Sequence, residues 1–215
     1  MPGFWSWYAF SRRRAVPTSS PDVLNEKKVI AYYRELASTF IERTLKLDSS
    51  AFLSDFVSFL PEGARVFDMG CGSGRDLKWL KAQGFHAEGL ERSPELAAFA
   101  RSYSGCRVWE ADFENWDFKD IKADGLLFSG SLVHLPEERV ISVMERLGSL
   151  LTGHGRIYVS LKEGNGTYRD KNGRIFYLWE KEKAESLWGK VGRNILFFSS
   201  QKSGAGTDWL SWVLE

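Results

Sequence analysis

The chain has 215 residues, of which 43% are hydrophobic and 27% charged, and this length and composition predict one domain with a substantial core. No run of about 18 uninterrupted apolar residues occurs, which excludes a membrane-spanning helix. The net charge is only +1, so the sequence lacks the broad basic field that is typical of nucleic-acid-binding proteins.

Residues 1–19 are predicted to form a flexible arm. Residues 12–14, all arginine, follow the apolar stretch "FWSWYAF", whereas the charges of an export signal precede its apolar segment. The two cysteines, Cys71 and Cys106, lack metal-ligand spacing and do not suggest a disulfide framework. A cytoplasmic location is therefore expected.

The first predicted helix begins at Ser20 and Pro21, because proline is well tolerated at the first helical position. Apolar residues then recur at helical spacing through Ile30, Tyr33, Ala37, Phe40, Ile41 and Leu45. A second short helix carries Phe52, Leu53, Phe56 and Val57, and it ends before Pro61.

From residue 64 onward, short apolar runs alternate with amphipathic segments. Strands are predicted at 65–69, 86–90, 107–110, 125–128 and 156–161, and helices at 74–83, 94–102, 137–150 and 180–190. This alternation predicts an α/β fold, a parallel sheet with helices on both faces. The final segments, "NILFFSS" and "TDWLSWVL", predict an antiparallel hairpin, so one strand near the edge should be reversed.

The stretch "RVFDMGCGSGRD" marks the first candidate site. A strand that ends in Asp68 and leads through Gly70, Gly72 and Gly74 into a helix is typical of a nucleotide site at the carboxyl end of a sheet. A dinucleotide fingerprint would require a third glycine at position 75, which is Arg75. The acid at the strand tip favours a cationic amino group over a diphosphate.

Two more acids follow the next two strands. Glu91 ends the second strand and can accept hydrogen bonds from both hydroxyls of a ribose. Asp112 follows the third strand and can accept a hydrogen bond from an exocyclic amine, while Phe113 can lie against a flat ring. An acid for an amine, an acid for a ribose and a clamp for adenine together indicate S-adenosylmethionine.

Taken in order, these motifs resemble the class I S-adenosylmethionine-dependent methyltransferases. "VFDMGCGSG" is similar to the first motif of that superfamily, "GLERS" to its ribose-binding strand end and "ADFENW" to its adenine-binding turn. "ADGLLFSGSLVHLP" and "LLTGHGRIYVSLKEG" resemble its fourth and fifth strands. "YRELASTF" resembles the Y-D-x-x-A-x-x-Y segment of many small-molecule members, with Tyr33 in the first aromatic position, Arg34 in place of Asp and Phe40 in place of the second Tyr.

The resemblance implies a Rossmann-like three-layer sandwich with a seven-stranded, mostly parallel sheet and one antiparallel strand near the C-terminal edge. It implies one domain over 20–215, with a helical lid at 20–61, a cofactor-binding half at 64–161 and an acceptor-side half at 162–215. No metal is required. The implied cofactor-binding residues are Tyr33, Asp68, Gly70, Cys71, Gly72, Gly74, Arg75, Asp76, Glu91, Arg92, Ser93, Asp112, Phe113, Ser129 and Gly130.

The candidate catalytic residues are His134 and Tyr33. A neutral imidazole at His134, in "SLVHLPEE", can take a proton from a hydroxyl acceptor, although this segment also uses its histidine for packing. His86 is predicted in a strand and His154 in the turn "TGHG". Tyr33 and Phe40 are interpreted as a lid rather than as core.

Two features on the acceptor side stay open. The tryptophans on periodic faces are interpreted as core or as pocket wall: Trp179, Trp188, Trp209 and Trp212. The polar stretch "KEGNGTYRDKNGR", at 162–174, is either a solvated loop or a cover over the acceptor.

We expect methyl transfer to an O, N or S atom of a small molecule by in-line displacement, in a monomer or homodimer. In an alternative interpretation, an RNA, tRNA or protein methyltransferase docks its substrate through residues 12–14 with Trp5, Trp7 and Tyr8. A further alternative is a non-catalytic partner protein that keeps the fold. A nicotinamide oxidoreductase is disfavoured by the glycine spacing.

Overall fold

The computed structural model describes residues 21–119, 121–202 and 208–215. The predicted arm at 1–19 and most of the glycine-containing turn of the last hairpin lie outside these segments. The main sheet has the strand order β3-β2-β1-β4-β5-β9-β8. Its strands are β1 (Arg65–Met69), β2 (His86–Glu91), β3 (Arg107–Glu110), β4 (Ala123–Ser129), β5 (Leu151–Lys162), β8 (Ile195–Gln201) and β9 (Trp209–Leu214).

Among the seven strands of the main sheet, β9 alone runs in the opposite direction. Strands β1 to β5 pair in parallel, whereas β9 is antiparallel to both β5 and β8. The reversed strand therefore lies next to the edge, and the predicted Rossmann-like fold class is confirmed. No helix in the described segments is long and apolar enough to cross a membrane.

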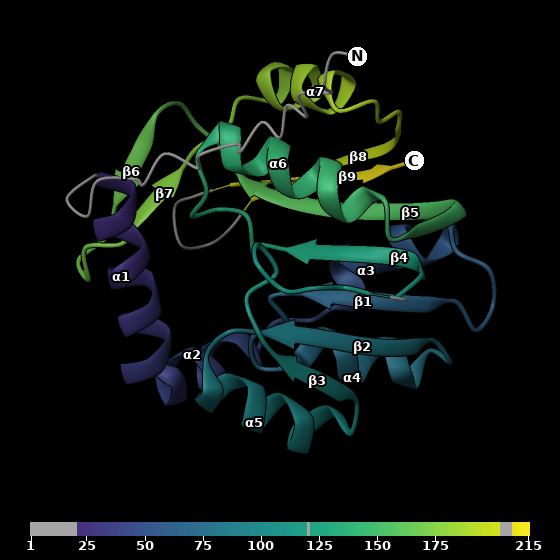
Figure 1. Ribbon diagram of the computed structural model, residues 1–215, viewed down its shortest axis with the longest axis horizontal. Coiled ribbons are helices and arrows are strands. Elements are labelled where there is room, and N and C mark those ends of the chain that lie inside the picture. The colour runs from purple at the N-terminus through teal and green to yellow at the C-terminus, as the bar shows by residue number, and fades with distance from the viewer. Residues whose placement is uncertain (1–20, 120, 203–207) are drawn as a thin grey trace, which may run out of the picture.

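Helices cover both faces of this sheet (Figure 1). They are α3 (Ser50–Ser58), α4 (Arg75–Ala82), α5 (Pro94–Ser104), α6 (Glu137–Gly148) and α7 (Lys181–Lys190). Adjacent strand residues point to opposite faces, so Leu126 packs in the cluster of α6 and α7, while Leu127 packs in that of α3 and α4. The result is the three-layer arrangement that the alternating sequence pattern predicts.

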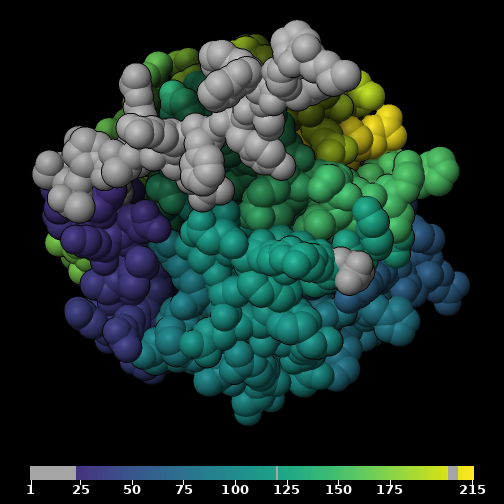
Figure 2. All heavy atoms as spheres, viewed as in Figure 1, coloured from purple at the N-terminus to yellow at the C-terminus, as the bar shows by residue number. Residues whose placement is uncertain are grey.

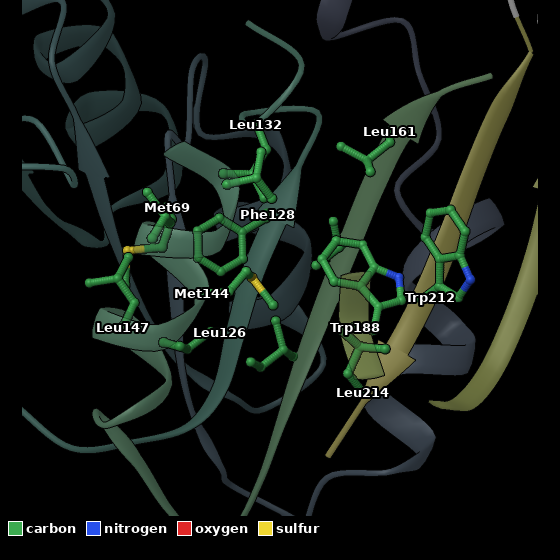
Figure 3. Close-up of a cluster of buried hydrophobic side chains, with 14 of the residues drawn as sticks. Met69, Leu126, Phe128, Leu132, Met144, Leu147, Leu161, Trp188, Trp212 and Leu214 are labelled. Carbon is green, nitrogen blue, oxygen red and sulfur yellow. The ribbon is translucent and has the colours of Figure 1, made fainter. Parts of the chain in front are cut away.

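The tryptophans predicted as core or pocket wall divide between these two roles. Trp179, Trp188 and Trp212 are at most 2% exposed, and the rings of Trp188 and Trp212 lie 5.7 Å apart (Figure 3). Burying side chains of this size contributes strongly to the core. Trp209, at the start of β9, instead lines the cavity described below.

The single helix predicted from residue 21 to about 45 is wrong, because the structure contains two helices. α1 (Pro21–Glu35) and α2 (Ala37–Thr44) are separated by Leu36, whose φ of −112° and ψ of 27° are not helical. No glycine or proline marks this break. Tertiary packing accounts for it, since the change of direction lets the rings of Tyr33 and Phe40 meet edge to face at 5.1 Å.

Two other predictions need correction. The stretch at 162–174, interpreted as either a solvated loop or a cover over the acceptor, contributes to a small hairpin, β6 (Thr167–Arg169) with β7 (Ile175–Tyr177), and is therefore not all loop. Strand β5 begins at Leu151 rather than at 156, so His154 lies in a strand and not in a turn. Leu151 of β5 pairs with Ala123 of β4, and Arg156 pairs with Gly125. The pairing therefore shifts register between Ala123 and Gly125.

The parallel strands all end on the same side of the molecule. Their arrowheads point toward α1 and the β6–β7 hairpin, which lie side by side (Figure 1). Asn25 connects these two elements, because its Oδ1 accepts a 2.7 Å hydrogen bond from the Ile175 amide. In the space-filling view, the purple atoms of α1 adjoin the teal atoms of the neighbouring part of the chain (Figure 2).

Candidate functional site

A cavity of about 770 Å³ lies at the carboxyl ends of the parallel strands. It is bounded by the glycine turn after β1, by the ends of β2, β4 and β5, and by α1, α2 and the β6–β7 hairpin. This volume is in the range of small-molecule sites. Of the residues predicted to bind a cofactor, those that line the cavity are Tyr33, Asp68, Gly70, Cys71, Gly72, Arg75, Asp76, Glu91, Arg92, Asp112, Phe113, Ser129 and Gly130.

The glycine turn requires bare backbone at two positions that line the cavity. Gly70 and Gly72 have φ angles of 85° and 54°, which L-residues with a side chain rarely adopt. A Cβ at Gly70 would lie 2.8 Å from Cβ of Ser131, and one at Gly72 would lie 3.0 Å from the ring of Phe40. Phe40 of α2 therefore covers the turn, which agrees with its interpretation as a lid.

Gly74 and Ser93 do not line the cavity and have local roles instead. A Cβ at Gly74 would lie 2.9 Å from Ala100, so this glycine lets α4 pack closely against α5. Ser93 is the N-cap of α5, and its hydroxyl accepts a hydrogen bond from the Leu96 amide. These two residues support the site without facing the cavity.

Asp68 ends inside the cavity with an unsatisfied oxygen. The residue is 1% exposed, and its Oδ2 has no hydrogen-bond partner among the described residues. Burial raises the pKa of its carboxyl well above the usual range, and the nearby carboxyls of Asp76 and Glu91 raise it further. A cationic ligand group would both satisfy this oxygen and favour its charged form.

Glu91, at the end of β2, is hydrogen-bonded to the glycine turn that follows β1. Its Oε2 accepts a 3.0 Å hydrogen bond from the Gly72 amide, and its Oε1 accepts one of 2.8 Å from the Ser93 amide. Burial raises the pKa of this carboxyl, and the two amide donors oppose that change. Because each carboxylate oxygen has a second lone pair, Glu91 can still accept hydrogen bonds from a diol.

Asp112 and Phe113 occupy the turn after β3. One oxygen of Asp112 accepts a 2.9 Å hydrogen bond from the Glu114 amide, and the other lies 3.5 Å from Arg92. Phe113 meets Phe128 edge to face at 6.2 Å. Asp112 thus stabilises its own turn and also lines the cavity.

Arg75 and Asp76 form a buried ion pair at the start of α4. Oδ1 of Asp76 accepts hydrogen bonds of 2.7 Å from Nε of Arg75 and of 2.6 Å from the hydroxyl of Ser49. Sequence reasoning did not single out Ser49, because it comes from the loop before α3. Cys71 also lines the cavity, and burial raises the pKa of its thiol well above the usual range, which makes it a poor nucleophile.

The two candidate catalytic residues are in contact. Nδ1 of His134 lies 2.8 Å from the Ile175 carbonyl oxygen, which can only accept, so the proton resides on Nδ1. Nε2 is then the acceptor, and the Tyr33 hydroxyl donates a hydrogen bond to it at 3.4 Å; both residues line the cavity. Burial, together with the nearby Arg174 and Arg92, lowers the pKa of His134 to about 4. The imidazole is therefore neutral at physiological pH.

Sequence reasoning missed the residues that form the opposite end of the cavity. Lys162 at the end of β5, Arg174 just before β7 and Phe176 of β7 all line it. Lys162 and Arg174 are the first and last residues of the stretch 162–174, which is interpreted as a loop or a cover over the acceptor. Neither was singled out as a site residue, because the position of Arg174 depends on a hairpin that the sequence did not predict.

Residues 66–155 match the model of a family described as a methyltransferase domain. Among curated proteins, a Xylella fastidiosa ubiquinone biosynthesis O-methyltransferase is 31% identical over 104 residues, which cover 46% of this chain and 42% of the relative. A mouse protein named probable tRNA methyltransferase 9B is 28% identical over 63% of this chain and 30% of its own length. The chain thus spans less than half the length of these relatives.

Solved structures share the fold at low identity. A Burkholderia thailandensis 1,6-didemethyltoxoflavin-N1-methyltransferase, bound to 1,6-didemethyltoxoflavin and S-adenosylhomocysteine, has a TM-score of 0.70 at 22% identity, covering 93% of this chain and 90% of its own. A Synechocystis magnesium protoporphyrin IX methyltransferase with bound S-adenosylhomocysteine has a TM-score of 0.69 at 14% identity, covering 88% and 98%. Residues 66–155 therefore resemble a methyltransferase domain, and the chain shares its fold with these two methyltransferases.

Proposed function

We propose that the chain binds S-adenosylmethionine and transfers its methyl group to an O, N or S atom of a small molecule. One observation carries this proposal: the buried, unpartnered oxygen of Asp68 and the carboxylate of Glu91 face one cavity across a turn of glycines. A cationic ligand with a neighbouring diol matches that pair of acids. The family match over 66–155 supports the same activity.

The residues present fit this cofactor. Asp68 would accept hydrogen bonds from its ammonium group, and Glu91 would accept them from its ribose hydroxyls. Asp112 and Phe113 would hold the adenine, one by its exocyclic amine and the other by contact with its ring. Gly70 and Gly72 would let the cofactor approach the backbone closely, because neither residue carries a Cβ. The site has no room for one, since a Cβ at either position would contact a neighbouring side chain.

When bound, the cofactor would supply an activated methyl group for transfer to a lone pair of the acceptor. The chain's own contribution is orientation, which can lower the barrier by up to about 7–11 kcal/mol. Nε2 of His134 is placed to accept the proton that a hydroxyl or amine acceptor gives up. Because the pKa of His134 is low, its imidazole is suited to take the acceptor's proton late in the reaction, when methyl transfer has already made that proton acidic.

Calorimetric titration with S-adenosylhomocysteine tests the binding site. We expect micromolar affinity in the native chain and at least about a tenfold loss in Asp68→Ala, which removes a charge-assisted hydrogen bond. Asp48→Ala, an exposed change at the mouth of the same cavity, is the matched control. If a folded Asp68→Ala variant bound S-adenosylhomocysteine as tightly as the native chain does, the assignment of Asp68 to the binding site would be wrong.

Turnover distinguishes an enzyme from a partner protein that only keeps the fold. Release of S-adenosylhomocysteine when labelled cofactor is mixed with a metabolite extract is the expected result. Binding without turnover, for metabolites, tRNA and protein alike, would instead favour the non-catalytic alternative.

The likeness to a probable tRNA methyltransferase favours a second candidate, a macromolecular acceptor. Residues 1–18, which include three arginines and no acid, would then help to dock the substrate. Deleting these residues should leave small-molecule methylation and cofactor affinity unchanged if the first proposal holds. Loss of tRNA or protein retention with intact cofactor affinity would support the second.

A further inference from the structure

Charges of opposite sign gather at the two ends of the cavity. Asp68, Glu91 and Asp112 line the end next to the glycine turn, and the two arginines that line it as well, Arg75 and Arg92, are paired with Asp76 and Asp112. The end formed by β5, β7 and the strand ends beyond them is lined by cations, namely Arg43, Lys162, Arg174 and Lys202. A cavity with this polarity suits two ligands of opposite charge, and only the cationic one is assigned above.

Lys162 is the centre of the basic end. It is half-buried, and no carboxylate lies within ion-pair distance of its Nζ in the described part of the chain. Burial lowers its pKa, and the positive charges of Arg174 and Arg43 lower it further. An anionic ligand beside Lys162 would offset both its burial and the repulsion from the two arginines.

Aromatic rings form the walls around this charge. Nζ of Lys162 lies 4.8 Å from the centre of the Phe176 ring and 5.0 Å from that of Trp209. The Phe176 ring is in turn 4.3 Å from the His134 ring. One aromatic ring therefore separates the free ammonium of Lys162 from the candidate base.

Arg174 adds a second, rigid donor. It is 6% exposed, and its Nε and Nη2 donate hydrogen bonds of 2.9 and 2.7 Å to Oδ2 of Asp170. Its guanidinium lies 3.4 Å from the centre of the Tyr32 ring, which holds the plane in place. Nη1 has no hydrogen-bond partner among the described residues, so it can donate into the cavity.

We propose that Lys162 and Arg174 form an acceptor subsite that binds a carboxylate or phosphate group on a flat, aromatic-sized substrate. This inference rests on the proposed function, and it narrows the acceptor to an anion. The acidic group would lie between Lys162 and Arg174, the flat part against Phe176 and Trp209, and the atom to be methylated on the side of Tyr33 and His134.

Matched small probes test this subsite in the full chain saturated with S-adenosylhomocysteine. Benzoate, phenyl phosphate and uncharged benzamide are titrated in turn and followed by ligand-observed NMR. We expect at least one anion to bind about tenfold more tightly than benzamide, because a charge-assisted contact replaces a neutral one. Tighter binding of benzoate or of phenyl phosphate identifies which anion the site prefers.

Substitutions assign that preference to Lys162. Lys162→Met keeps the apolar stem between the two rings and should abolish the preference, whereas Lys162→Arg should keep it. Lys190→Met, an exposed change in the last turn of α7, removes the same charge elsewhere and should have no effect. Benzamide binding as tightly as both anions, no binding of any probe, or an unchanged preference in Lys162→Met would each overturn the proposal.

A separate titration keeps the two proposals apart. If S-adenosylhomocysteine fails to bind, the proposed function fails, and the probe titrations are then made on the cofactor-free chain. An anion preference that depends on Lys162 there would support the subsite alone. Normal cofactor binding without any anion preference would overturn only the subsite.

Discussion

Gly72 and Gly84 have left-handed backbones in very different surroundings. Their φ angles are 54° and 88°, but a Cβ at Gly72 would meet the Phe40 ring, whereas one at Gly84 would meet nothing within 4 Å. We predict that Gly72→Val lowers S-adenosylhomocysteine affinity at least about tenfold, by displacing the lid and narrowing the cavity. Calorimetry on the folded variant measures this loss.

Gly84→Val is the matched control for backbone strain. It should cost about 1–2 kcal/mol of unfolding free energy, as Gly72→Val does, because both force a side chain into the left-handed region. Its cofactor affinity should stay at the native value. A loss of affinity in Gly84→Val equal to that in Gly72→Val would show that strain, and not the cavity, controls binding.

His134 should make the stability of the chain depend on pH. Its pKa is about 4 in the folded state against 6.5 ordinarily, so between these values the unfolded chain binds a proton that the folded chain does not. Its contribution is complete above pH 6.5 and is lost progressively as the pH falls to about 4. Urea unfolding should show a loss about 3 kcal/mol larger in the native chain than in His134→Gln over that window.

The exposed His154 gives the comparison for this effect. His154→Gln should follow the native pH profile, because the side chain lies in solvent on β5. Identical profiles for the native chain and His134→Gln would contradict a neutral, buried imidazole at His134.

At the level of single residues, the acidic end of the cavity could be predicted from sequence and the basic end could not. Asp68 and Glu91 stand at the ends of parallel strands, and strand ends meet at one edge of a sheet whatever the details of packing. Arg174 reaches the cavity through a hairpin of two three-residue strands. Segments that short carry too little periodic signal to predict.

At the level of elements, the side chain of Asn25 hydrogen-bonds α1 to the hairpin. Asn25 is 3% exposed, accepts from the Ile175 amide at 2.7 Å and donates to the Ile175 carbonyl at 3.3 Å. We predict that Asn25→Ala costs about 2 kcal/mol of unfolding free energy and speeds hydrogen exchange in α1 and β7, since it leaves the half-buried Ile175 amide without its partner, while the Ile175 carbonyl keeps the hydrogen bond from Nδ1 of His134. Hydrogen-exchange mass spectrometry measures both segments.

Asn165→Ala is the control for this element. The Asn165 amide donates to Glu180 at 2.9 Å in an exposed position, so its removal should cost less than about 0.5 kcal/mol. Unchanged exchange in α1 and β7 of Asn25→Ala would show that the helix is held by other contacts.

The helices and strands were predictable where periodicity alone decides them. The segments from β1 to α6 each carry a strong apolar pattern, and their predicted positions differ from the observed ones by a few residues at most. The break at Leu36 was not predictable, because it depends on the contact of Phe40 with Tyr33 and with the glycine turn. Only the folded chain brings these groups together.

At the level of the whole molecule, the cavity joins segments that are far apart in sequence. Its walls include α1, the glycine turn after β1, the end of β5 and Trp209 of β9. A ligand that contacts all of them should stabilise the entire fold. At a concentration of about 100 times its dissociation constant, S-adenosylhomocysteine should add about 2.7 kcal/mol to the unfolding free energy.

Urea unfolding with and without the ligand measures that gain. Glu91→Gln should show a much smaller one, because a neutral amide accepts the ribose hydroxyls at one atom only and presents hydrogens at the other. A gain of the same size in Glu91→Gln would mean that the ligand binds elsewhere.

The most direct test is a crystal structure of the chain grown with S-adenosylhomocysteine. The account predicts the ribose hydroxyls on the carboxylate of Glu91, the amino group at Asp68 and the purine beside Asp112 and Phe113. A purine and sugar bound elsewhere, or a Glu91 carboxylate turned away from the ribose, would contradict it.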